Sequence, residues 1–243
     1  MKMFRPQKGS PIFLLPSLIT ISAMCAGFCA IIASTKNHYT FAYHLTLLAM
    51  VLDSLDGRVA RFTHTVSPFG AQMDSLSDML NFGIAPALIV YNWHLGTITR
   101  IGSIIAFIYT VCAALRLARF NVMLDTDMNK KYFIGLPSTA AAPIVVGYVW
   151  LCQYFDLNNK YFVILGVFVV LLSAFSMVSN INFYSFKELH VNQRARFKVL
   201  LLCVVCLILL AIFPELMIFI ALVSYTIISY ILHFISQRKL KTV

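Results

Sequence analysis

The amino-acid sequence predicts an all-α polytopic membrane protein, a bundle of about eight transmembrane helices with the N- and C-termini in the cytoplasm. Three observations support this prediction: the composition, a series of long apolar runs, and the uneven placement of the basic residues. Of the 243 residues, 60% are hydrophobic and 12% are charged, and the mean hydropathy is +0.84. Soluble domains have roughly 45–50% apolar and 25% charged residues. The chain is therefore expected to lie in a bilayer.

The apolar runs define the expected helices, because about 20 apolar residues cross the hydrocarbon core as a helix. No low-complexity tract and no repeat of fixed period separates them, so residues 1–243 are predicted to form a single integral membrane domain. The last two runs are separated only by Phe213-Pro214-Glu215, so that pair could also form one bent hairpin. The eight expected spans lie at about 12–34, 41–61, 72–93, 101–120, 136–154, 161–182, 198–213 and 215–236.

The basic residues indicate the orientation of these spans. With a cytoplasmic N-terminus, 16 of the 19 Lys and Arg residues fall on the cytoplasmic side, and only Lys36, Arg100 and Lys160 fall on the other. This asymmetry is the one that the positive-inside rule predicts. Because topology explains the basic residues, the pI near 9.4 does not indicate nucleic-acid binding. The first run is longer than the 7–15-residue core of a signal peptide, and a compact chain without a targeting segment favours the inner (plasma) membrane of a bacterium.

Four of the nine acidic residues lie between positions 53 and 78. Asp53 and Asp56 are three positions apart near the cytoplasmic end of one expected helix. Asp74 and Asp78 are four positions apart near the cytoplasmic start of the next, so each pair occupies one helix face. The connector between them, which contains Ser67-Pro68, reverses the chain and can bring the two faces together.

Such a cluster is unfavourable without a cation, since one acid at membrane depth costs roughly 2.5–3.5 kcal/mol and like charges repel. Ligand sets made only of oxygen suit hard cations such as Mg²⁺, Mn²⁺ or Ca²⁺. Two ions about 3.5–4 Å apart would form the clamp used in many phosphoryl transfers. The alternative is a salt-bridge network at the membrane edge with Arg58, Arg61 and Arg116. A cation transporter is a further alternative, although transporters place their acids near the midplane on broken, repeat-related helices.

The glycines near the aspartates add information. Gly57 follows Asp56 directly, in a helix where glycine costs about 1 kcal/mol relative to alanine. We expect it to admit a ligand close to the backbone, or else to serve helix packing. Gly70 precedes Asp74 by one helical turn and has either the same role or a role in the turn.

The whole stretch reads D-x-x-D-G-x-x-A-R-x₈-G-x-x-x-D-x-x-x-D and resembles the signature of the CDP-alcohol phosphotransferases. Every fixed position and both spacings are met. The resemblance implies the helical membrane fold of that family, two divalent cations and a CDP-linked substrate that enters from the cytoplasmic leaflet. The matching positions are Asp53, Asp56, Gly57, Ala60, Arg61, Gly70, Asp74 and Asp78.

The resemblance also implies a role for each position. All four aspartates would bind metal, and Asp78 would in addition act as the base on the incoming hydroxyl. Arg61 would pair with phosphate oxygens, a role that its planar fork suits. The CDP-binding set would be Asp56, Gly57, Arg61 and Gly70.

Two segments further along resemble the members of the family that use L-serine as the acceptor and CDP-diacylglycerol as the donor. They are Leu115–Asn121 and Phe133–Ala142. Two arginines one turn apart could hold a carboxylate or a phosphate, and uncharged hydrogen-bonding side chains suit an amino acid. Another acceptor, such as glycerol 3-phosphate, inositol or choline, stays open. The candidate acceptor residues are Arg116, Arg119, Asn121 and Ser138.

The resemblance covers about residues 11–185, the expected catalytic core. Residues 198–236 would add two transmembrane helices as scaffold or as the surface of a homodimer, the assembly that the resemblance implies. Near the start, Leu15–Thr20 resembles the Pro-Asn-x-x-Thr that often opens these proteins, but Ser17 stands in place of the asparagine. Because of that departure, the sequence does not decide whether a polar contact forms at this position.

Overall fold

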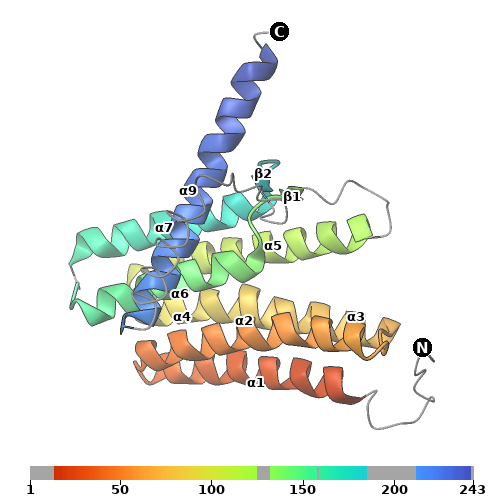
Figure 1. The fold of residues 1–243 in the computed structure, drawn as a ribbon. Helices are drawn as coiled ribbons and strands as arrows, with labels where there is room; N and C mark the ends of the chain where they lie inside the picture. The colour runs from red at the N-terminus through yellow and green to blue at the C-terminus, as the bar shows by residue number, and fades with distance from the viewer. Residues whose placement is uncertain (1–13, 125–131, 158, 185–211, 242–243) are drawn as a thin grey trace.

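The computed structural model describes residues 14–124, 132–157, 159–184 and 212–241, and these are mainly helical (Figure 1). A two-stranded antiparallel ribbon accompanies the helices. Its strands are β1 (Tyr132–Ile134) and β2 (Asn182–Tyr184), with Phe133 paired to Phe183. The helices are α1 (Leu14–Thr35), α2 (Tyr39–Phe62), α3 (Pro68–Asp78), α4 (Ala85–Trp93), α5 (Thr99–Leu124), α6 (Ser138–Tyr154), α7 (Lys160–Val178) and α9 (Pro214–Lys241).

Four of the described helices are long and apolar enough to cross a membrane: α1, most of α5, α7, and Pro214–Leu232 of α9. This result supports an integral membrane protein. Helix α6 follows the expected run 136–154 closely, and with 17 residues it lies at the lower limit of the length of a span. Helix α2 carries four charged residues in its second half, Asp53, Asp56, Arg58 and Arg61. The expected run 198–213 lies outside the described residues up to position 211, so the total of eight spans and the cytoplasmic termini stay predictions.

The expected run 72–93 is helical from residue 68 to residue 93, but it changes pitch in the middle. A π-helical segment, Met79–Ile84, joins α3 to α4 directly after Asp78. A π-turn widens the helix and disturbs the regular backbone ladder, and such turns occur often at functional sites. The buried Tyr109 on α5 donates its hydroxyl to the Phe82 carbonyl oxygen at 3.2 Å. This bond supplies a partner for a carbonyl inside the widened turn.

Helix α1 packs closely along α2 through small side chains. Ala23 and Ala30 of α1 and Ala42 and Ala49 of α2 are fully buried, and small residues are what let membrane helices approach closely. Helix α6 is buried along most of its length and forms the centre of the bundle. Figure 1 shows α1, α2 and α3–α4 running alongside one another, with α5, α6 and α7 beyond them and the C-terminal half of α9 extending away.

The short ribbon was not predicted, but it only supplements the predicted helical bundle, and it fixes the start of α6. After β1, Gly135 N–H donates to the Ile181 carbonyl and Leu136 N–H donates to the Ser176 carbonyl, each at 2.9 Å. Gly135 has φ +81°, a conformation that glycine adopts readily. The segment before α6 is therefore held against the end of α7, which places Ser138 at a defined position.

Candidate metal and substrate site

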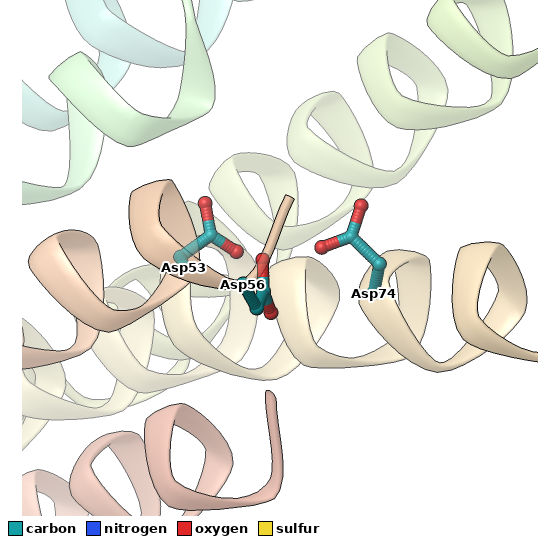
Figure 2. Close-up of side chains that lie close together, drawn as sticks. All are labelled: Asp53, Asp56 and Asp74. Atoms are coloured by element: carbon teal, nitrogen blue, oxygen red, sulfur yellow. The ribbon is translucent and has the colours of Figure 1, made fainter. Parts of the chain in front are cut away.

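Three aspartates converge between α2 and α3. Asp53 and Asp56 come from α2 and Asp74 from α3, and one carboxylate oxygen from each lies within 4.8 Å of the others. Asp56 is 3% exposed. Figure 2 shows the carboxylates of Asp53 and Asp74 directed toward one another, with Asp56 between them. We call these three residues the aspartate triad.

The convergence follows from the short connector between the two helices. Helix α2 ends with Thr63 N–H donating to the Val59 carbonyl at 2.8 Å and Thr65 N–H donating to the Ala60 carbonyl at 3.0 Å. Ser67 then caps α3, since its hydroxyl accepts the Gly70 N–H at 3.0 Å, and Pro68 occupies the first turn. The chain therefore reverses between residues 62 and 68, which brings the two acidic faces together.

Asp78 is the last residue of α3 and lies one turn beyond Asp74, outside the triad. Oδ1 of Asp78 and Oδ1 of Asp53 are both buried, and neither has a hydrogen-bond partner among the described residues. An ionised carboxylate accepts but cannot donate hydrogen bonds, so buried oxygens of this kind need a donor or a cation.

No described Lys or Arg side chain forms an ion pair with these aspartates. An ion pair between described residues is His44–Glu215, at 2.8 Å, between the start of α2 and the start of α9, away from the triad. Arg58, Arg61 and Arg116 form none, although all three are described. No direct salt bridge therefore joins these arginines to the aspartates, although Arg61 and Arg116 interact electrostatically with Asp74 and Asp78 at longer range. The oxygen-only cluster fits divalent cations instead.

Thr20 on α1 is a further residue of the site, and its hydroxyl donates to Oδ2 of Asp56 at 2.6 Å. Thr20 is 4% exposed. The segment Leu15–Thr20 was noted in the sequence as resembling the opening of the family, but Thr20 was not assigned to the site and any polar contact there was left open. A contact between residues 36 positions apart becomes visible only when α1 is packed against α2.

The four candidate acceptor residues separate into three places. Arg116 Nη1 donates to the Ser138 hydroxyl at 2.8 Å, so this pair is brought together. Arg119 Nη2 instead donates to Oδ1 of Asn180 at 2.9 Å. Asn121 Nδ2 donates to the hydroxyl of Ser75, the neighbour of Asp74, at 3.0 Å. The sequence did not single out Ser75 or Asn180.

Arg116 is the member of this set that faces the aspartates. Its guanidinium interacts electrostatically with Asp78 across the space between α5 and α3. Its Nε is buried and has no partner among the described residues. A charged group with unused donors near an acidic cluster is suited to hold an anionic group of a substrate.

The two glycines of the motif differ in their surroundings. A Cβ added at Gly57 would meet only Nη2 of Arg61, at 3.8 Å, so the space beside this helix face is open. A Cβ added at Gly70 would lie 3.2 Å from the Ser67 hydroxyl that caps α3. Gly57 and Arg61 thus share an open face, whereas Gly70 has a structural role in the cap.

Comparison with known proteins identifies the family to which the chain belongs. Residues 13–177 match the family model described as CDP-alcohol phosphatidyltransferase. The chain is 38% identical over 192 residues to the CDP-diacylglycerol–serine O-phosphatidyltransferase of Helicobacter pylori, covering 76% of this chain and 78% of the relative. It is 32% identical over 225 residues to the protein of that name from Mycobacterium bovis (91% and 78%) and 33% identical over 174 residues to the archaetidylserine synthase of Methanothermobacter thermautotrophicus (71% and 72%).

Proposed function

We propose, from the premise that the chain belongs to the CDP-alcohol phosphatidyltransferase family, that it transfers the phosphatidyl group of CDP-diacylglycerol to the hydroxyl of L-serine. The products are phosphatidylserine and CMP. Several relatives are named for this reaction. The structural observation that carries the proposal is the aspartate triad, with the buried and unpartnered oxygens of Asp53 and Asp78 beside it.

In this proposal Asp53, Asp56, Asp74 and Asp78 hold two divalent cations, Mg²⁺ or Mn²⁺, with Ca²⁺ as a further possibility. Bound cations of this kind supply charge neutralisation at a pyrophosphate oxygen. Arg61 and the open helix face at Gly57 would receive the cytidine diphosphate, together with Asp56 and Gly70. The support is geometric, because the face at Gly57 is free of side chains within 3.8 Å.

Asp78 is the proposed base. Its buried Oδ1 has no described donor, so it is free to accept the proton of the serine hydroxyl. The serine oxygen then forms a bond to the β-phosphorus of CDP-diacylglycerol, and the bond from that phosphorus to the CMP oxygen breaks. The electron pair leaves with CMP.

Arg116 and Ser138 are the proposed acceptor contacts. A guanidinium held by the Ser138 hydroxyl, with a buried and unused Nε, can bind the carboxylate of serine. Arg119 and Asn121 would join them only where a substrate displaces Asn180 and Ser75. A phosphorylated acceptor such as glycerol 3-phosphate also suits an arginine, so it is the second candidate; inositol and choline offer Arg116 no anion.

We further propose that the site faces the cytoplasm at the inner membrane of a bacterium and that the active form is a homodimer. The described ends that surround the triad are the start of α1, the end of α2 and the start of α3. These are the ends that the positive-inside rule assigns to the cytoplasm.

The deciding experiment uses the purified protein with CDP-diacylglycerol, Mn²⁺ or Mg²⁺, and each candidate alcohol in turn, and it measures CMP release. We expect CMP release when L-serine is the added alcohol and no release with the other alcohols. Release with glycerol 3-phosphate but not with serine would overturn the acceptor assignment and leave the transferase assignment in place.

A further inference from the structure

Helix α1 contributes one polar contact to the aspartate triad. The Thr20 hydroxyl lies 2.6 Å from Oδ2 of Asp56, and both side chains are at least 95% buried. Charge-assisted O–H···O⁻ bonds are typically 2.5–2.7 Å long and roughly twice as strong as neutral ones. The contact therefore has the geometry of a strong bond in a place that excludes water.

The same hydroxyl has a second possible acceptor, the Pro16 carbonyl one turn earlier, at 3.0 Å. A hydroxyl carries only one proton, and a bond to the carbonyl four residues back is the ordinary local choice of a helical threonine. The carboxylate is both nearer and charged, so it is the better acceptor. This preference fixes one oxygen of Asp56 toward α1 and leaves the other free to face Asp53 and Asp74.

We infer that Thr20 is a positioning residue for the metal site: its hydroxyl holds the Asp56 carboxylate in the rotamer that completes the triad. The inference rests on the proposed function for the identity of the ions, but it concerns this chain's own residues. Partners that orient a ligating side chain typically change metal affinity or activity by 10–100-fold when they are removed. Thr20 does not touch the substrate in this role.

Thr20→Val tests the inference because it removes the hydroxyl and keeps the shape. The measurement is the Mn²⁺ concentration that half-saturates the thermal stabilisation of the purified protein in detergent, without substrate. We expect Thr20→Val to raise this concentration about 10-fold or more. Thr20→Ser retains the hydroxyl and should stay within about 2-fold of the parent. In the CMP-release assay, the activity of Thr20→Val should recover as Mn²⁺ is raised.

The matched control is Thr46→Val. Thr46 is equally buried, on α2, but its hydroxyl donates only to the Ala42 carbonyl, at 2.9 Å. This variant should leave the Mn²⁺ dependence unchanged. A Thr20→Val protein with the parental Mn²⁺ half-saturation would overturn the inference, whatever its melting temperature. If the parent protein itself shows no Mn²⁺-dependent stabilisation, the metal site of the proposed function is wrong. If the parent is stabilised by Mn²⁺ and Thr20→Val has the same half-saturation, only the role of Thr20 is wrong.

Discussion

Arg116 and Ser138 are joined by a hydrogen bond of 2.8 Å between α5 and the first residue of α6. If this pair binds the serine carboxylate, Ser138→Ala should leave the guanidinium unoriented. Hydrogen bonds to charged groups contribute about 1.5–3 kcal/mol, so we expect the KM for serine to rise about 10-fold or more. The KM for CDP-diacylglycerol and the Mn²⁺ dependence should not change. Ser103→Ala, an exposed serine at the other end of α5, is the control. Equal effects on both substrates would argue against an acceptor role.

Gly57→Ala should separate substrate binding from folding. Alanine has the better helix propensity by about 1 kcal/mol, and its Cβ would meet no atom closer than 3.8 Å. We therefore expect a melting temperature equal to or above that of the parent and a higher KM for CDP-diacylglycerol. The matched change Gly70→Ala crowds the Ser67 cap at 3.2 Å and should lower the melting temperature. An unchanged KM in Gly57→Ala would show that the donor does not lie on this face.

Removal of one charge from the aspartate triad should stabilise the metal-free protein. The carboxylates of Asp53 and Asp74 repel each other without a cation, so Asp53→Asn measured in EDTA should melt about 2–4 °C higher, equivalent to about 1 kcal/mol. The same variant should lose the stabilisation that Mn²⁺ gives the parent. A lower melting temperature in EDTA for Asp53→Asn would contradict this account.

Asp78→Asn should abolish transfer while the protein still folds and inserts. The amide keeps the volume of the side chain but cannot take the proton of serine, and general bases contribute about 10²–10⁴-fold in rate. The measurement is CMP release at saturating serine and Mn²⁺, alongside the melting temperature and membrane insertion. Near-parental release by this variant would remove Asp78 from the role of base.

Gly27→Ala should be destabilising through a single neighbour. Its Cβ would lie 2.1 Å from Oδ1 of Asn81, in the π-helical segment that follows Asp78. Overpacking of this kind costs about 1–3 kcal/mol. The double variant Gly27→Ala, Asn81→Ala removes the clashing amide and should recover more stability than additive effects allow. If the two single variants lose amounts of unfolding free energy that add up to the loss of the double variant, the destabilisation by Gly27→Ala does not come from a clash with Asn81.

The sequence predicted the helices best where apolar runs are bounded by polar turns. The run 41–61 appears as Tyr39–Phe62, and 101–120 appears within Thr99–Leu124. The π-helical segment was not predicted, because the sequence does not reveal contacts from other helices, such as the bond from the Tyr109 hydroxyl to the Phe82 carbonyl. The β-ribbon also escaped prediction, since three-residue strands have no periodicity of their own.

The convergence of the acids could be predicted because spacing fixes a helix face and the connector is short. Asp53, Asp56 and Asp74 do lie together, and Asp78, one helical turn beyond Asp74, borders them and interacts with Asp53. The partner of Arg119 could not be predicted, because Asn180 lies 61 positions away and only the packing of α5 against α7 brings it near. Contacts between distant helices decide such pairings.

The aspartate triad comes from one helical hairpin, with its outermost members only 21 positions apart in the chain. The entropy cost of closing a loop grows only slowly with its length and is small at this separation. Proteins are synthesised from the N-terminus, so α1, α2 and α3 are complete while the rest of the chain is still being made. In biogenesis, the acidic centre can therefore assemble first, and α5, α6 and α7 add the acceptor side to a centre that already exists.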